Sequence, residues 1–297
     1  MTNEDKKIFE EISKLNLFNA EEIKNFILKH SDILQGEIVT DKSSNIFTAK
    51  EDIKKLIIFD FSPIGVSATN IIDERIYLDT IGLKDGKRLN GKKTSIGVIK
   101  KEKNKIYIEN CDKNLELLYK NYNVIEESIC EGDLLYGLQL QAYIPLFLLV
   151  KLISMDTHSV NAFNFTLVNK TLSSDCGYIE IIKRLMPEEL IFISVCCDKD
   201  ALKNDIGPAI VIKDGNGVTK EDVYSKIRNI AIENNIPHQF FIGKKDKAYE
   251  KISVSKQNMD FCAIYIPTEK LSNGIDKVVY DDVEKTLKLL LKCIYNM

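Results

Sequence analysis

The chain has 297 residues, which is enough for one large α/β domain or two smaller ones. Hydrophobic residues make up 44% of the sequence and charged residues 29%, as in ordinary soluble globular proteins. A net charge of −3 argues against the basic surface that a nucleic-acid-binding or anionic-membrane-binding protein needs.

Neither a secretory leader nor a disulfide framework is predicted. The first residues, Met-Thr-Asn-Glu-Asp-Lys-Lys, are not followed by an apolar core. The seven cysteines are odd in number and scattered, without the two-residue gap of a zinc knuckle or redox motif. These features predict a cytoplasmic protein.

Apolar spacing predicts two N-terminal helices followed by strands. A helical stripe covers residues 5–17, and Asn19-Ala20-Glu21-Glu22 predicts the capping-box start of a second helix. Strands are predicted at 36–39, 46–49 and 56–61.

From 62 to 133 the residue pattern changes to short β-like runs, at 66–68, 76–78, 94–99 and 105–109. Asp-Gly, Asn-Gly and lysine-rich turns separate them, which predicts a small, β-barrel-like inserted domain. We interpret the lysines between 87 and 105 as a solvated face.

An uncharged segment follows between Asp133 and Lys151. Its length is at the lower limit for a membrane span, but it contains a glycine, two glutamines and Pro145. We therefore predict a buried core helix over 137–153, kinked at the proline, and no membrane span.

The second half alternates strands with helices. The predicted strands are 163–168, 190–195, 209–212, 240–242 and 262–266, and the predicted helices are 174–185, 219–234 and 281–294. Thr219-Lys220-Glu221-Asp222 predicts a capping-box variant at the start of the second of these helices. This alternation predicts a mixed, largely parallel sheet covered by helices on both faces. The α/β domain would comprise 1–61 and 134–297, and the inserted β domain 62–133.

The last sixty residues carry an ordered set of motifs. Ile236-Pro237-His238-Gln239 leads through Gly243 to Ala263-Ile264-Tyr265-Ile266-Pro267-Thr268 and then to Glu269-Lys270-Leu271-Ser272-Asn273. With Ile64-Gly65 and Ile206-Gly207-Pro208-Ala209-Ile210 upstream, this resembles the deblocking, or glutamyl, aminopeptidases, also labelled endoglucanase M. The resemblance implies a zinc-aminopeptidase-like fold, two zinc, cobalt or manganese ions, and tetrahedral shells.

The resemblance also locates the family's cleft on this chain, where the side chains are of other types. The positions are Asp60, Ser62, Leu140, Asn169, Lys170, Cys196, Asp246 and Ser272. We assign none of them as a catalytic residue or a metal ligand.

Each substitution removes a specific function of the family site. Asp60 and Ser272 stand where the family has metal-binding histidines, and Leu140 stands for the aspartate that bridges both ions. Asn169 and Lys170 replace a Glu-Glu pair that supplies the general base and a ligand. Ser62 and Cys196 each replace an aspartate.

The histidine content supports this interpretation without the resemblance. Only His30, His158 and His238 occur, and none lies within helical or strand spacing of another. A lysine at the position of the general base would also repel a divalent cation. We therefore predict a catalytically inactive homologue without a metal cofactor: a peptide-binding, regulatory or assembly subunit. The expected partners are a second copy, an active aminopeptidase paralogue or peptides, and neither nucleic acid nor a membrane.

Three alternatives stay open at this point. The first is an active, metal-dependent aminopeptidase with a rearranged site that uses Asp60, Cys196, Asp198 or Asp246. The second is a thiol nucleophile at Cys196-Cys197-Asp198 with His158 or His238 as its base. The third is a purely structural interaction module.

Overall fold

The computed structural model describes residues 1–31, 38–42, 44–48, 50, 53–83, 86–109, 115–126, 130–155, 162–169, 176–244, 247–255, 259–272 and 275–296. The predicted cleft residues Lys170 and Asp246, and also His158, lie outside these ranges. Among the helices described, none is both long and apolar enough to cross a membrane.

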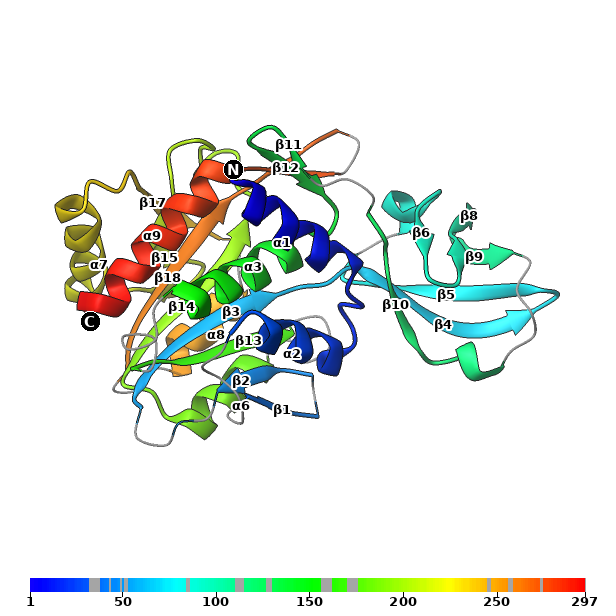
Figure 1. Cartoon of the computed structure of the whole chain (residues 1–297), viewed down its shortest axis with the longest axis horizontal. Helices are drawn as coiled ribbons and strands as arrows, with labels where there is room; N and C mark the ends of the chain where they lie inside the picture. The colour runs from blue at the N-terminus through cyan, green and yellow to red at the C-terminus, as the bar shows by residue number, and fades with distance from the viewer. Residues whose placement is uncertain are drawn as a thin grey trace.

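A nine-stranded mixed sheet forms the larger part of the molecule (Figure 1). Its order is β1 (Ile38–Thr40), β2 (Ile46–Thr48), β13 (Asn164–Asn169), β3 (Lys55–Phe61), β14 (Glu189–Cys196), β18 (Asp260–Pro267), β15 (Ala209–Asp214) and β16 (Gly217–Val218), and β17 (Gln239–Gly243) also pairs with β15. The central strands β13, β3, β14 and β18 run parallel, whereas β15 is antiparallel to β18. The predicted mixed, largely parallel sheet is confirmed.

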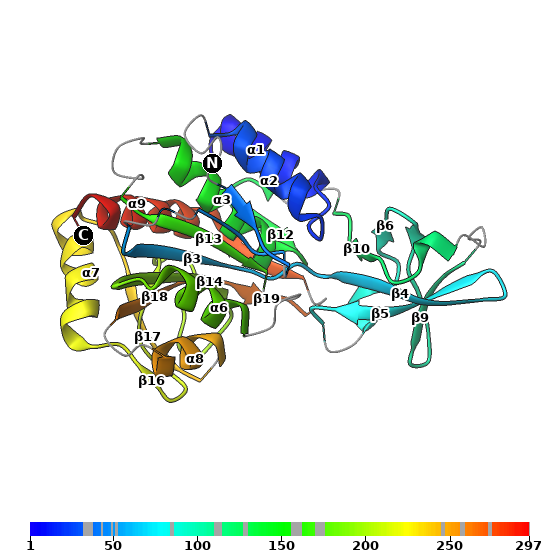
Figure 2. The same ribbon diagram turned by 90° about the horizontal axis from the view of Figure 1, so that it is seen from below.

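Helices cover both faces of this sheet, as Figure 2 shows. One face carries α1 (Asn3–Lys14), α2 (Ala20–Lys29), α3 (Leu140–Met155), α7 (Glu221–Glu233) and α9 (Tyr280–Asn296), and the other carries α6 (Cys176–Leu185) and α8 (Lys247–Ser255). Successive strand side chains point to opposite faces. In β3, Ile57 and Phe59 therefore join the core on the α3 side, and Ile58 joins the core on the α6 side.

The helix from the uncharged segment is the centre of the larger core. α3 is apolar on all sides because it lies between the sheet and the helices α1 and α9. Its Phe147 stacks on Phe9 of α1, with ring centroids 4.3 Å apart. The predicted buried helix is confirmed, with Pro145 inside it.

Helix starts follow local chemistry at one predicted capping site and not at another. The Asn19 side chain accepts hydrogen bonds from the N–H groups of Glu21 and Glu22, as predicted. The capping role predicted for Thr219 is wrong. Its hydroxyl instead donates to the Val211 carbonyl at 2.7 Å and lies 2.6 Å from the Tyr249 hydroxyl.

The segment predicted as an insertion forms the second lobe of Figure 1. Its sheet has the order β10 (Asn121–Asn123), β4 (Gly65–Ile72), β5 (Arg75–Ile81), β9 (Lys105–Glu109) and β8 (Lys100–Glu102). Beside it lie the short pair β6 (Lys93–Thr94) and β7 (Gly97–Val98) and the 3-10 turns Gly86–Leu89 and Leu115–Leu117. Within the strands described, the sheet is open at both edges and does not close into a barrel. The domain limits at residues 62 and 133 stay a prediction.

A small four-stranded sheet joins the ends of distant segments. Its order is β11 (Cys130–Glu131), β12 (Leu134–Gly137), β20 (Asp276–Val279) and β19 (Glu269–Lys270). Gly137 is the register partner of Asp276. This pairing brings the start of α3 next to the C-terminal segment that carries Ser272.

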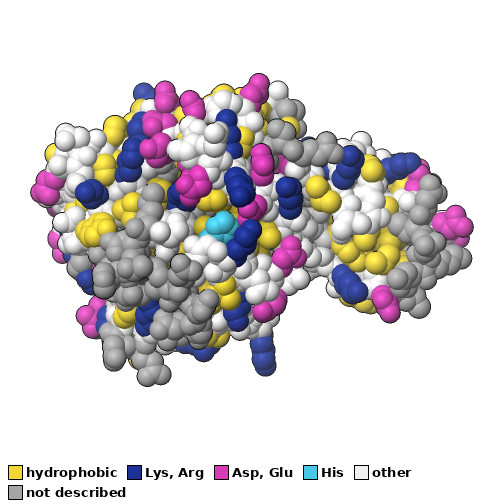
Figure 3. Space-filling model, in the orientation of Figure 1, with side chains coloured by type: hydrophobic (Ala, Val, Ile, Leu, Met, Phe, Trp, Pro, Cys, Tyr) yellow, Lys and Arg dark blue, Asp and Glu magenta, His cyan; other side chains and the backbone are white. Residues whose placement is uncertain are grey.

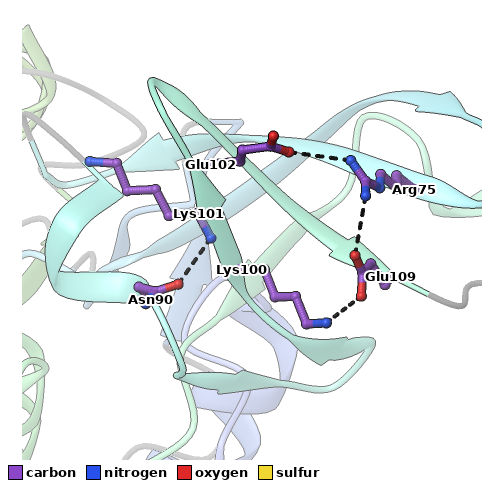
Figure 4. A network of polar contacts seen from close by, with 6 residues as sticks. All are labelled: Arg75, Asn90, Lys100, Lys101, Glu102 and Glu109. Carbon is purple, nitrogen blue, oxygen red and sulfur yellow. Dashed lines mark hydrogen bonds and ion pairs between the residues drawn. The ribbon is translucent and has the colours of Figure 1, made fainter.

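Charges on the outer face of the second lobe are paired in part. Arg75 contacts Glu102 at 3.5 Å and Glu109 at 3.3 Å, and Lys100 also pairs with Glu109 (Figure 4). Over the face drawn in Figure 3, acidic and basic side chains are interspersed. This distribution fits the interpretation of the lysine-rich stretch as a solvated face.

Candidate functional site

The carboxyl ends of neighbouring parallel strands bring three of the predicted cleft residues to one edge of the sheet. Asp60 lies one residue before the end of β3, and Asn169 and Cys196 end β13 and β14. Val168 is the register partner of Asp60, and Phe59 is the partner of Ile193. Parallel α/β sheets place their ligand-binding residues at this edge.

The carboxylate of Asp60 is the centre of a buried hydrogen-bond network. It accepts bonds from the hydroxyls of Tyr178 at 2.7 Å, Ser194 at 2.8 Å and Ser62 at 3.1 Å. Tyr178 comes from α6 and Ser194 from the adjacent strand β14, so both bonds link separate elements. Since the Asp60 side chain is only 5% exposed, these hydroxyls replace the water that would otherwise solvate it.

Two more predicted positions lie beside this network. The Ser62 N–H donates to the Gln141 carbonyl at 3.2 Å, which places Ser62 against the first turn of α3. Leu140, the residue before Gln141, is fully buried in the core of that helix. The position that the resemblance assigns to the bridging aspartate therefore holds an apolar side chain without a metal-binding atom.

Asn169 and Cys196 have structural partners. The Asn169 N–H donates to the side chain of Asn45 at 2.9 Å, and the Cys196 carbonyl accepts from the Thr268 N–H at 3.0 Å. The Cys196 side chain packs in the core on the α6 side. The alternation of side chains puts Asp60 and Cys196 on the α6 face and Asn169 on the α3 face.

Among the described residues, no hydrogen bond links Ser272 to Asp60, Asn169 or Cys196. Ser272 is exposed, in the turn between β19 and β20. The turn is closed by the Leu271 N–H, which donates to the Ile275 carbonyl at 2.9 Å.

The residues present do not fit a dinuclear metal centre. The Asp60 oxygens are bonded to hydroxyls, Leu140 offers no ligand atom, and Asn169 offers a neutral amide. In the part of the chain that the structure covers, no three His, Cys, Asp or Glu side chains are placed to hold a metal ion.

The thiol alternative fails on distance for His238. This residue precedes β17, and the sheet order places β18 and β15 between β14 and β17. Three strand spacings separate Cys196 from His238, about 14 Å, which is far beyond hydrogen-bond reach. The ring nitrogen Nδ1 of His238 instead lies 3.0 Å from the Ile236 carbonyl.

His30 and Asp198 each have a local role. His30 contacts Glu11 at 3.3 Å and caps the end of α2. Asp198 accepts bonds from the N–H groups of Asp200 at 3.2 Å and Ala201 at 3.3 Å, which fixes a turn.

The sequence interpretation missed Tyr178 and Ser194 as partners of Asp60. One signal was available, because Asp60 and Ser194 are polar residues inside otherwise apolar strands. A polar side chain in such a strand needs a partner, and strand neighbours are the nearest source. Nothing in the local sequence indicates Tyr178, which α6 brings to the site.

Comparisons with known proteins bear on the fold. Residues 179–289 match the family model of the M42 glutamyl aminopeptidases. The TET1 peptidase of Pyrococcus horikoshii is similar in structure, with a TM-score of 0.77 and 16% identity over 99% of this chain and 100% of that chain. The chain has the fold of the M42 aminopeptidases.

Other M42-like structures support the same assignment. An aminopeptidase of Desulfurococcus kamchatkensis gives a TM-score of 0.77 at 16% identity, covering 99% of this chain and 96% of that chain. An endoglucanase of Thermotoga maritima gives 0.69 at 16% identity, covering 93% and 90%. None of the curated proteins matches the sequence. The resemblance to the glutamyl aminopeptidases is confirmed.

Proposed function

We propose that this M42-like chain is a catalytically inactive homologue of the metal-dependent aminopeptidases that acts as a peptide-binding, regulatory or assembly subunit without a metal cofactor. The observation that carries the proposal is the Asp60 network. Where the family has its first metal ligand, three hydroxyls bond a buried carboxylate. A cation at this position would have to displace those donors.

Element analysis of the purified protein tests the absence of a metal. We expect less than one zinc, cobalt, manganese or other transition-metal ion per chain after brief dialysis without a chelator. Two tightly held ions per chain, or peptide hydrolysis that EDTA abolishes, would overturn the proposal. The second result would establish the rearranged active site instead.

A restored variant provides the positive control. It carries Asp60→His, Ser62→Asp, Leu140→Asp, Asn169→Glu, Lys170→Glu, Cys196→Asp and Ser272→His. If the strand-end positions correspond to the family's site, this variant should gain metal binding in the same assay. Its folding must be checked by circular dichroism, since Leu140 is a core residue.

Self-association is part of the proposal. The similar TET1 peptidase is described as assembling into a tetrahedron or a large octahedral shell. On β17 of this chain, Phe240 is 40% and Ile242 62% exposed, and apolar side chains on an edge strand favour contact with another chain. Light scattering after size exclusion tests this, alone and mixed with an active paralogue. A monomer in both experiments contradicts the assembly role and leaves peptide binding as the proposed function.

A further inference from the structure

A pocket of about 300 Å³ lies at the junction of the two lobes. Its lining includes Lys92 with its neighbours Gly91 and Lys93, Tyr136 and Gly137 of β12, and Ile275. Glu126, in the segment after β10, also lines it. None of the predicted cleft residues that the structure describes lines it. Its volume is at the small end of ligand pockets, which suits a molecule of one or two amino-acid residues.

The Glu126 carboxylate is held firmly in this pocket. It accepts bonds from the N–H groups of Leu138 at 2.7 Å and Gln139 at 3.1 Å, just before the first turn of α3. Gly137 makes room for it, because a Cβ atom there would lie 2.6 Å from a carboxylate oxygen of Glu126. Backbone groups thus fix the position of this carboxylate in the pocket lining.

A second carboxylate lies close by on the same side of the small sheet. Asp276 is the register partner of Gly137, so its side chain and the Glu126 carboxylate share one face. Asp276 is only 2% exposed, and its Oδ1 has an ion pair with Arg88 at 3.5 Å but no hydrogen bond among the groups described. Nε and one terminal nitrogen of Arg88 are likewise buried without hydrogen-bond partners in the same part of the structure. This ion pair is not part of the pocket lining, and Asp276 acts on Glu126 through its charge.

Both acidic and basic side chains act on the pocket. Burial raises the pKa of the Glu126 carboxyl, Asp276 adds to the rise, and the two N–H donors and Lys92 oppose it. Burial also raises the pKa of Asp276, with Arg88 and Lys270 opposing. A cationic group beside Glu126 would stabilise its charged form, and Lys92 could then pair with an anionic group of the same ligand.

We propose that the junction pocket binds a small zwitterion, a free α-amino acid or a dipeptide, with its ammonium group at Glu126 and its carboxylate at Lys92. The ammonium and carboxylate of the ligand would pair with Glu126 and Lys92, respectively. The small volume of the pocket limits the distance between the two charged groups of the ligand. The proposal concerns residues outside the strand-end site. It stands or fails independently of whether that site binds metal.

Calorimetry with blocked ligands tests both charges. The probes are L-leucine and Gly-Leu, N-acetyl-leucine without the ammonium group, and leucine methyl ester without the carboxylate. We expect leucine or Gly-Leu to bind, and both blocked forms of leucine to bind at least about tenfold more weakly than the better free ligand. The proposal is overturned if neither free ligand binds at millimolar concentration, or if blocking either group leaves the affinity unchanged.

Variants connect the two charges to the two side chains. Lys92→Ala should weaken binding of the free ligand about tenfold and leave the affinity for the methyl ester unchanged. Glu126→Gln should weaken binding of both by a similar factor, and N-acetyl-leucine should be insensitive to it. Because Glu126 also bonds the start of α3, Ile125→Trp is a second variant that fills the pocket from an exposed position and should abolish binding.

The matched control is Lys183→Ala, which removes an exposed lysine of α6. It should leave every affinity unchanged. An equal loss in Lys92→Ala and Lys183→Ala would show a nonspecific charge effect and overturn the assignment of the carboxylate to Lys92.

Discussion

Two carboxylates near the start of α3, those of Asp60 and Glu126, have different surroundings. Asp60 is bonded by three side-chain hydroxyls between β3, β14 and α6. Glu126 is bonded by two backbone N–H groups and lines a pocket that also contains a lysine. Hydroxyl donors from neighbouring elements surround the Asp60 carboxylate. The Glu126 carboxylate is held in position beside the pocket. The comparison teaches that a buried acid marks a binding site only where its donors leave room for a ligand.

The largest effect is expected at the closed site. Asp60→Ala should lower the free energy of unfolding by about 3 kcal/mol, because it leaves the buried hydroxyls of Tyr178 and Ser194 without their acceptor. Urea denaturation measures the change. Asp200→Ala, in an exposed turn, is the control and should change it by less than about 0.5 kcal/mol. A neutral or stabilising Asp60→Ala would show that the network is not structural and would break the comparison.

Asp282 tests whether burial affects the pKa of a carboxyl group more strongly than backbone N–H donors do, as it does at Glu126. It accepts a bond from the Asp205 N–H at 2.8 Å, yet burial raises its pKa from 3.8 to about 6. An acid with a raised folded-state pKa contributes stability that is present below its unfolded pKa and lost as the pH rises through its folded value. The loss should therefore occur between pH 3.8 and about 6.

The measurement compares wild type with Asp282→Asn across that pH range. The wild type should lose on the order of 2 kcal/mol relative to the variant as the pH rises. Parallel stability curves for the two proteins would contradict the raised pKa.

Gly137→Ala tests how firmly Glu126 is held. The added methyl group would collide with the carboxylate, so we expect a loss of about 1 to 2 kcal/mol in the free energy of unfolding. In a Glu126→Ala background the same substitution should be nearly neutral, since the collision partner is absent. An equal loss in both backgrounds would mean that the glycine serves another contact.

The smallest effect is expected at the rim of the Asp60 network. Ser62 is half-buried, whereas Ser194 is only 4% exposed. Ser62→Ala should therefore cost about 0.5 kcal/mol, and Ser194→Ala about 1 kcal/mol or more, in chemical denaturation. A larger loss of stability for Ser62→Ala than for Ser194→Ala would show that the hydrogen bond at the strand end stabilises the network more than the bond inside the sheet.

Much of the fold followed from local patterns. The strands of the large sheet except β16, the buried α3 and the closing helix α9 were predicted because apolar periodicity reports which side of an element is buried. The Asn19 cap was predicted because its donors are two and three residues away. The Thr219 cap was not formed, because contacts with Val211 and Tyr249 offered its hydroxyl other partners.

Part of the candidate site was also predictable from the sequence, and part was not. The order of motifs located Asp60, Asn169 and Cys196, and parallel pairing then brought them to one edge. The sequence could not show that Ser272 is in an exposed turn, since turn exposure depends on what packs against it. Lys170 and Asp246 stay predictions.

By itself, the sequence determined the alternation of elements, the shortage of histidines and the side-chain types at the positions that the resemblance assigns to the cleft, because each depends on residue identity and local spacing. Only the tertiary structure decided that Tyr178 and Ser194 enclose Asp60. It also brought Glu126, Lys92 and Asp276 to one junction from three distant segments. Hydrogen-bond satisfaction and desolvation act between groups close in space, and packing sets those distances.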